Sequence, residues 1–305
     1  MSVQTLNYAS PGAILPPKRN WWDPYIPPAF ITLILLAGNW HFGILESPWK
    51  TIAAIVAAML ADMLLGKLIV GKIPHLASAY ITGISVGILV RSPYFWTYPL
   101  CGVVSIVSKY ALRLNNRHLW NPSNFGVSAL LFLAPWAFTG LSLQWGNNFA
   151  PMIVIWVLGF LITWKVKRFH MSLTYAMSFV FFAYVRHLIK HESFWVEVAP
   201  ITGPMYMLFT FFMVTDPKTT VKPRWAQYVF VFMVAAVECV LRMNEAVKAP
   251  YYALFIVGPT ANLLEILLTR KAAKPAVAVN TAASSAAPPL ATAGTGAWGS
   301  VESRV

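Results

Sequence analysis

The sequence predicts an all-α integral membrane protein with ten transmembrane helices, arranged as a five-plus-five inverted repeat with two broken helices. Three observations predict this class: an apolar composition, apolar stretches close to bilayer length, and a charge bias between alternate loops. Of the 305 residues, 58% are hydrophobic and 11% are charged, whereas soluble domains average about 25% charged residues. This composition excludes a soluble enzyme, a disordered scaffold and a disulfide-stapled secreted module.

Ten apolar stretches approach the length of about 20 residues that a helix needs to cross a bilayer. They cover residues 25–44, 51–70, 76–90, 94–112, 121–141, 149–164, 169–189, 201–214, 225–241 and 249–268. We therefore expect a ten-helix membrane domain over residues 25–270, which contacts the lipid bilayer along its length.

Shorter segments flank this domain, and the domain itself divides into halves at 25–141 and 149–268. Residues 1–24 are expected to form a cytoplasmic N-terminal segment. Residues 271–305 are rich in Ala, Pro, Ser, Thr and Gly, a composition that cannot bury a core. They are expected to form a disordered cytoplasmic tail.

The basic residues indicate the orientation of the chain. With the N-terminus in the cytoplasm, 17 of the 23 Lys and Arg residues lie in the loops on that side, as the positive-inside rule requires. We therefore expect a multi-pass protein of the cell inner (plasma) membrane with both termini cytoplasmic. The net charge of +13 is explained by this bias, and no nucleic-acid partner is expected because no polar domain carries a basic patch.

Two of the ten stretches are short and end at similar tetrapeptides. The third closes with Ser92-Pro93 and the eighth with Asp216-Pro217. Proline removes a backbone donor and blocks the next helical turn, so each stretch is expected to contain a broken helix. The two lie five spans apart and therefore run in opposite directions, which predicts an inverted repeat whose breaks converge between the halves.

Each half also closes with a span that contains a proline near its start or middle. Asn121-Pro122 opens the fifth stretch, and Gly258-Pro259 interrupts the tenth. We expect a helix start at the first of these and a start or break at the second.

Two motifs resemble a known family. Residues 120–126 (WNPSNFG) are similar to the asparagine–proline motif that opens the fifth span of the RnfD/NqrB family, and residues 211–217 (FFMVTDP) are similar to the signature that ends its eighth span. Members of that family are ten-span membrane proteins of Rnf-type electron transport complexes and of the sodium-translocating NADH:quinone oxidoreductase. The resemblance covers roughly residues 25–268. It implies a urea-transporter-like inverted repeat, electron transfer coupled to transmembrane transport, and other membrane subunits of a redox complex as partners.

The chain departs from the family where its covalent cofactor is attached. Respiratory members carry FMN on the threonine of a Ser/Thr-Gly-Ala-Thr motif after the fifth span, but the corresponding loop at 142–148 reads SLQWGNN. The resemblance is therefore to a divergent member without covalent FMN, in which a flavin or quinone could still bind non-covalently. Such a chain is at most one component of an oxidoreductase or ion-translocating complex.

Five polar residues at the motifs are the candidate binding residues. We expect Thr215 and Asp216 from one half, with Ser92, Asn121 and Asn124 from the other, to line one polar cavity. An acid at the end of a membrane helix is costly unless it pairs, caps a turn or binds a cation, so Asp216 is the leading candidate. Its alternative role is a local cap or a pair with a nearby lysine, and the alternative for the asparagines is hydrogen bonding to unwound backbone.

Other ionisable residues have simpler interpretations. Asp62 is expected to pair with Lys67 one turn further on, with a proton or cation relay as the alternative. Glu238 and Arg242 have the spacing of a helical ion pair. No metal site is expected, although His187 and His191 have a spacing that permits one. The two cysteines, each within an apolar run, are expected to be buried packing thiols.

Three functions remain open. The first is an electron-transfer protein that binds flavin or quinone between its halves. The second is a transporter or channel for a small polar solute or cation, which the inverted repeat and broken helices also favour. The third is a non-redox membrane scaffold, which the missing flavin-attachment motif favours.

Overall fold

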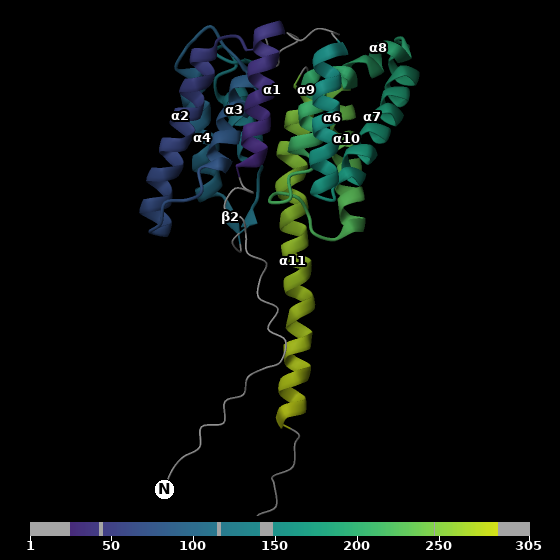
Figure 1. The fold of residues 1–305 in the computed structure, drawn as a ribbon. Coiled ribbons are helices and arrows are strands. Elements are labelled where there is room, and N and C mark those ends of the chain that lie inside the picture. Colours follow the sequence, from purple (N-terminus) through teal and green to yellow (C-terminus); the bar gives the residue numbers. More distant parts are fainter. Residues whose placement is uncertain (1–24, 43–44, 115–116, 141–148, 247, 286–305) are drawn as a thin grey trace, which may run out of the picture. The chain divides into compact units, whose positions relative to one another are not determined.

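A computed structural model describes residues 25–42, 45–114, 117–140, 149–246 and 248–285. The chain is mostly helical and divides into two units, residues 1–262 and residues 263–305. The first unit contains all the helices up to α10 and the beginning of α11, and Figure 1 shows their order along the chain.

The first half of the chain forms a bundle centred on α2. Its helices are α1 (Ile26–Phe42), α2 (Pro48–Leu65) with the π-helical turn η1 (Gly66–Val70), α3 (Ala77–Leu89), α4 (Thr97–Ala111) and α5 (Pro122–Leu133). Glycines on α3 allow a close contact with α2, because a Cβ on Gly83 would lie 2.4 Å from the Ile55 Cα. Small residues at helix contacts are typical of membrane bundles, where they let backbones approach.

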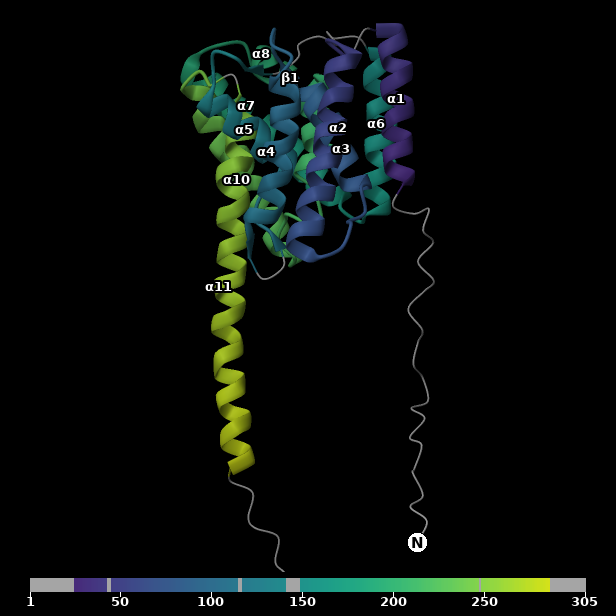
Figure 2. The same ribbon diagram turned by 90° about the vertical axis from the view of Figure 1, so that its left-hand side faces the viewer.

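In the second half, α7 packs against α10. The helices here are α6 (Phe149–Lys165), α7 (Phe169–Lys190), α8 (Phe194–Val198), the 3-10 turn η2 (Ala199–Thr202), α9 (Pro204–Leu208), the π-helical turn η3 (Phe209–Met213), α10 (Arg224–Met243) and α11 (Ala249–Ser285). The two halves also meet directly, since α1 and α6 are in contact and lie side by side in Figure 1 and Figure 2.

Four helices are long and apolar enough to cross a membrane: Pro48–Val70, Phe169–Lys190, Arg224–Met243 and Ala249–Thr269. A fifth candidate is the bent pair Phe194–Thr202 and Tyr206–Met213, which turns by 68°. Ala77–Leu89 and Pro122–Leu133 are apolar but shorter. By length and composition, the described residues thus contain four to five candidate spans, fewer than the ten that the sequence predicts.

The distribution of side chains is typical of a protein surrounded by lipid. Large apolar side chains such as Leu36 and Ile69 are exposed, whereas Asp62 and Glu238 are almost completely buried. Soluble monomers rarely expose apolar surface on this scale, and ionisable residues inside membrane proteins face the bundle interior. The structure therefore fits an all-α membrane protein.

Both predicted helix breaks coincide with departures from regular α-helix. After α3, the chain becomes extended at strand β1 (Val90–Arg91), which pairs with β4 (Thr139–Gly140) beyond α5. Before Asp216-Pro217, the chain winds into the π-helical turn η3 and then leaves the helix. A second short ribbon joins β2 (Arg113–Leu114) to β3 (Arg117–His118).

The break expected at Gly258-Pro259 is absent, because α11 runs through both residues. Pro259 has no N–H to donate to the carbonyl of Phe255, which lies four residues earlier. The indole Nε1 of Trp120 donates to that carbonyl instead, at 2.9 Å. A tertiary hydrogen bond thus replaces the missing helical one and lets the helix continue.

This replacement gives a testable coupling between Trp120 and Pro259. Trp120→Phe should lower the free energy of unfolding by about 1–3 kcal/mol, because it leaves a partly buried carbonyl without a donor. In a Pro259→Ala background the restored N–H can donate to Phe255, so the same substitution should have little effect. Thermal or denaturant unfolding of the wild type and the three variants measures this coupling, and equal losses in both backgrounds would contradict it.

The C-terminal tail differs from its expected form over residues 271–285. These residues continue α11 to Ser285, where disorder was expected from residue 271. The segment is rich in alanine, which has the highest intrinsic helix propensity. Residues 286–305 of the expected tail, and residues 1–24 of the N-terminal segment, lie outside the described residues.

Candidate functional site

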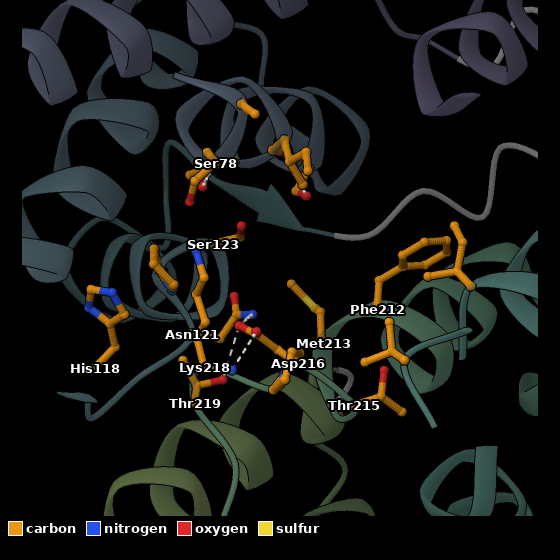
Figure 3. A pocket seen from close by; sticks show the side chains of 18 of the residues that line it. Ser78, His118, Asn121, Ser123, Phe212, Met213, Thr215, Asp216, Lys218 and Thr219 are labelled. Carbon is orange, nitrogen blue, oxygen red and sulfur yellow. Dashed lines mark hydrogen bonds between the residues drawn. The ribbon is translucent and has the colours of Figure 1, made fainter. Parts of the chain in front are cut away.

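One described pocket, with a volume of about 410 Å³, is lined by both family-like motifs. Its walls come from α1, α3, the end of α4, the start of α5, the end of α6 and residues 211–219. Figure 3 shows Asn121, Ser123, Asp216 and Thr219 around this hollow, with Phe212 and Met213 on its apolar side. Residues about 95 positions apart in the chain therefore share one site.

Asp216 is held by three donors. Its Oδ1 accepts from the backbone N–H of Lys218 at 3.0 Å, and its Oδ2 accepts from Thr219 Oγ1 at 3.1 Å. The third donor is Asn121 Nδ2, 3.0 Å from Oδ2, which comes from the first half of the chain. The first two bonds form the local cap that was the alternative role, but the third makes Asp216 a link between the halves.

Asn121 has two functions in this arrangement. It is the N-cap of α5, where its Oδ1 accepts from the Asn124 N–H at 3.2 Å, and Pro122 occupies the first helical position. Asparagine followed by proline is a strong helix start, because the side chain satisfies a free N–H and the ring fixes a helical φ. The cap fixes the orientation of the amide, so that its Nδ2 faces Asp216.

Thr215 lines the pocket, but its hydroxyl donates to the carbonyl of Phe211 one turn earlier. Threonine commonly makes this bond near the end of a helix. Thr215 therefore forms part of the pocket wall, but its hydroxyl hydrogen is used in the bond to Phe211 and cannot be donated to a ligand.

Two of the five predicted residues are not among the residues that line the pocket, so the single cavity made by all five is wrong. Ser92 donates to the Ala137 carbonyl at 2.6 Å, and its N–H donates to Glu46 at 3.3 Å. The pairing of β1 with β4 holds Ser92 beside these partners, Ala137 and Glu46, and not beside the pocket. The Asn124 side chain donates to the carbonyl of Tyr251 at 3.3 Å and accepts from Ser128, which is the backbone role considered as its alternative.

Three side chains that the sequence did not indicate as candidates hydrogen-bond to the loop at residues 216–220. Asn262 Nδ2 donates to the Thr219 carbonyl at 2.6 Å, and Arg117 donates to the Thr220 carbonyl at 3.0 Å. Arg168 donates to the Thr220 hydroxyl. The available signal was the position of Asn262 in an apolar span, since a buried polar residue there needs a partner.

A buried ion pair adjoins the pocket. Lys109 Nζ lies 2.8 and 2.9 Å from the two carboxylate oxygens of Asp62, whose side chain is fully buried, and the Tyr110 hydroxyl donates to Asp62 at 2.8 Å. Lys109 is itself one of the residues lining the pocket. The expected pairing of Asp62 with Lys67 is therefore wrong, because the rotation of α2 directs Asp62 into the contact with α4.

A second buried cluster lies between α7, α9 and α10. The predicted pair of Glu238 and Arg242 is confirmed, with Arg242 Nε 3.0 Å from Oε1. Tyr175 and Tyr206 each donate to the same carboxylate at 2.5 Å. The four side chains of this cluster hydrogen-bond with one another, and none of the four lines the pocket.

The loop that follows α4 lies in positive potential. The pKa of His118, which lines the pocket, is lowered to about 4 by burial and then by the charges of Arg113, Lys109 and Lys218. Its imidazole is therefore neutral at pH 7, and its Nδ1 accepts from Arg113 Nε at 3.5 Å. In the described residues, no group of three or more His, Cys, Asp or Glu side chains could hold a metal ion, and both Cys101 and Cys239 are buried free thiols.

Searches against protein-family models and against curated proteins find no match to this chain.

Proposed function

We propose that this chain is a membrane protein of the RnfD/NqrB type that takes part in electron transfer coupled to transmembrane transport. The observation that carries the proposal is the hydrogen bond between Asn121 and Asp216 at the wall of the pocket. It joins the two motifs on which the family resemblance rests. A site assembled from both halves is the place where a broken-helix repeat is expected to bind its ligand.

The pocket has the composition that a flavin or quinone requires. Its volume of about 410 Å³ lies within the range of about 300–1,000 Å³ found for small-molecule sites. Phe212 and Met213 supply an apolar surface for a ring system, while Asn121 and Thr219 supply polar groups for its edge. When bound, such a ring would supply the capacity to accept and release electrons.

The chain's own contribution is positioning. Two hydrogen bonds fix the amide of Asn121. Its Nδ2 donates to Asp216, and its Oδ1 accepts the cap bond of α5. Asn262 and Arg117 hold the loop that carries Asp216. Preorganised polar groups of this kind orient a ligand without a reorganisation cost at binding.

A visible absorption spectrum of the purified protein tests this proposal. We expect the blue absorption band of oxidised flavin, or a quinone in an organic extract, and we expect its loss from the Asp216→Leu variant. The chromophore should separate from the chain on denaturation, because the attachment motif is missing. A preparation that holds neither compound, and binds neither when they are added, would contradict electron transfer.

The proposal includes the finer topology of ten spans in an inverted repeat, with both termini on the cytoplasmic side of the inner membrane. Its support is that helix occurs within each of the ten predicted ranges. The contact of α2 with α4 also has a counterpart in the contact of α7 with α10. Each pair contains a buried polar interaction, Asp62 with Lys109 in the first and Tyr175 with Glu238 in the second.

Reporters at two positions test this topology. Single cysteines at Gly146 and Lys274 should react with a membrane-impermeant reagent from opposite sides of the membrane, since five spans separate them. Labelling from the same side would exclude the ten-span arrangement.

A transporter or channel for a small polar solute or cation is a second candidate, favoured by the Asp62–Lys109 pair at the pocket. Ionisable residues within membrane bundles often mark ion or substrate pathways. Flux of cations or small solutes into proteoliposomes, with Asp62→Asn/Lys109→Met as the comparison, tests this function. Flux by a protein that lacks flavin and quinone would favour the transporter or channel function over electron transfer.

A further inference from the structure

The start of α5 presents donors to the pocket that no described group uses. Ser123 is 7% exposed and lines the pocket. Among the described residues, neither its hydroxyl nor its backbone N–H takes part in a hydrogen bond, although the neighbouring Asn124 N–H is capped by Asn121. Figure 3 shows the Ser123 hydroxyl pointing into the hollow, with Ser78 facing it from α3.

Both serines lie in the first turn of a helix. α5 begins at Pro122 and has 12 residues, and α3 begins at Ala77 and has 13. The N-terminus of a helix carries a partial positive charge and free N–H groups, which favour an anion. Two helix N-termini therefore face one pocket, each with a serine hydroxyl beside it.

Lys109 adds a full positive charge to the same pocket. Its ammonium group has three N–H donors, of which Asp62 engages two. Among the described residues the third donor has no hydrogen-bond acceptor, and Lys109 lines the pocket. Asp216 is the acidic residue of the lining, and its carboxylate is already satisfied by Asn121, Lys218 and Thr219.

We propose that Ser123, Ser78, Lys109 and the N-terminus of α5 form a binding site for an anionic group with the chemistry of a phosphate. This inference rests on the proposed function only where it names flavin mononucleotide as the molecule that carries the bound phosphate. Free phosphate and the headgroup of an acidic phospholipid have the same chemistry, and the experiment separates these sources.

The test measures binding of inorganic phosphate to the full-length protein in phosphatidylcholine nanodiscs by calorimetry. Ser123→Asp is the main variant, because an acid in the first turn of α5 favours the helix while its carboxylate repels the anion. We expect the wild type to bind phosphate and the variant to lose at least about 100-fold in affinity, with no fall in its unfolding temperature. Ser123→Ala, which removes one hydrogen bond to a charged group, should lose about tenfold.

Ser85 provides a matched control. It lines the same pocket from α3, but its hydroxyl donates to the Ile81 carbonyl at 2.9 Å. Ser85→Ala should therefore bind phosphate as the wild type does. Equal losses in Ser85→Ala and Ser123→Ala would overturn the assignment of the anion to the α5 terminus.

Flavin probes separate this inference from the proposed function. Wild type should bind flavin mononucleotide at least about tenfold more tightly than riboflavin, and Ser123→Asp should remove that preference. Equal affinity for both flavins, together with no binding of phosphate, would overturn the anion site and leave flavin binding standing. Phosphate binding without binding of either flavin would support the anion site and contradict the flavin.

Nanodiscs that contain phosphatidic acid test the lipid source. Competition between this lipid and inorganic phosphate in the wild type, absent in Ser123→Asp, would support the site and assign the anion to the bilayer. Absence of binding by phosphate, flavin mononucleotide and phosphatidic acid would overturn the inference.

Discussion

Asp62→Asn is expected to lower the free energy of unfolding by about 3–5 kcal/mol, the cost of removing one partner from a buried ion pair. The substitution keeps the shape of the side chain but leaves the ammonium of Lys109, a residue that is 8% exposed, without its counter-charge. Lys109→Met should be similarly destabilising, because it leaves the fully buried Asp62 carboxylate with Tyr110 as its remaining side-chain donor.

The double variant Asp62→Leu/Lys109→Met should recover most of this loss. Replacing a buried pair by apolar side chains of similar volume is often neutral or stabilising, since both desolvation penalties disappear together. Thermal unfolding in detergent, followed by tryptophan fluorescence, measures all three variants. Two single variants that match the wild type, or a double variant that is no more stable than either single, would contradict the pair as a coupled unit.

The exposed Glu192 supplies the control for these charge changes. Glu192→Gln alters charge by the same amount as Asp62→Asn, but its side chain is on the surface. Exposed substitutions usually change stability by less than about 0.5 kcal/mol. A comparable loss in this control would attribute the effect to net charge rather than to burial.

Asp216→Leu is expected to abolish ligand binding and to lower the free energy of unfolding by about 2–4 kcal/mol. It leaves the partly buried Asn121 Nδ2 and Thr219 Oγ1 without their acceptor, and each buried orphaned donor costs about 1–3 kcal/mol. The Lys218 N–H also loses its acceptor, but it is exposed and can bond to water. Binding should fail because the bond from Asn121 to residue 216 is lost, so the loop no longer closes on the start of α5.

Asp216→Asn should spare the fold and impair binding. The asparagine can still accept from the Lys218 N–H, but its own amide group then faces the Nδ2 of Asn121. Asn121 cannot turn over to relieve this conflict without losing its cap on α5. Flavin or quinone affinity and the unfolding temperature, measured on the same preparations, distinguish the two variants, and wild-type affinity in Asp216→Asn would refute its role at the site.

A double-mutant cycle with Asn121→Ala measures the link between the halves. We expect the two substitutions together to cost less than the sum of the singles, because they remove the same hydrogen bond. Asn244→Ala is the control, since Asn244 is exposed and its side chain bonds within its own helix, to the Val240 carbonyl at 2.8 Å. If the losses in free energy of unfolding add exactly, the hydrogen bond between Asn121 and Asp216 contributes nothing to stability.

The sequence by itself determined the features that depend on composition and on local spacing. An apolar composition with few charges is sufficient to predict helices in lipid, because unpaired backbone cannot be exposed there. The i,i+4 spacing of Glu238 and Arg242 places both on one face of any helix, so their ion pair needed no tertiary information. The helix start at Asn121-Pro122 follows in the same way from local stereochemistry.

Only the tertiary structure decided which distant residues meet. Asp62 pairs with Lys109, 47 positions away, because the rotation of α2 against α4 selects its partner, and no local pattern records that rotation. Ser92 is withdrawn from the pocket by the pairing of β1 with β4. Pro259 leaves α11 unbroken because Trp120 supplies the missing donor. In each case the outcome depends on an atom from another element, and the free energy of a buried polar group depends on whether that atom is within hydrogen-bonding distance.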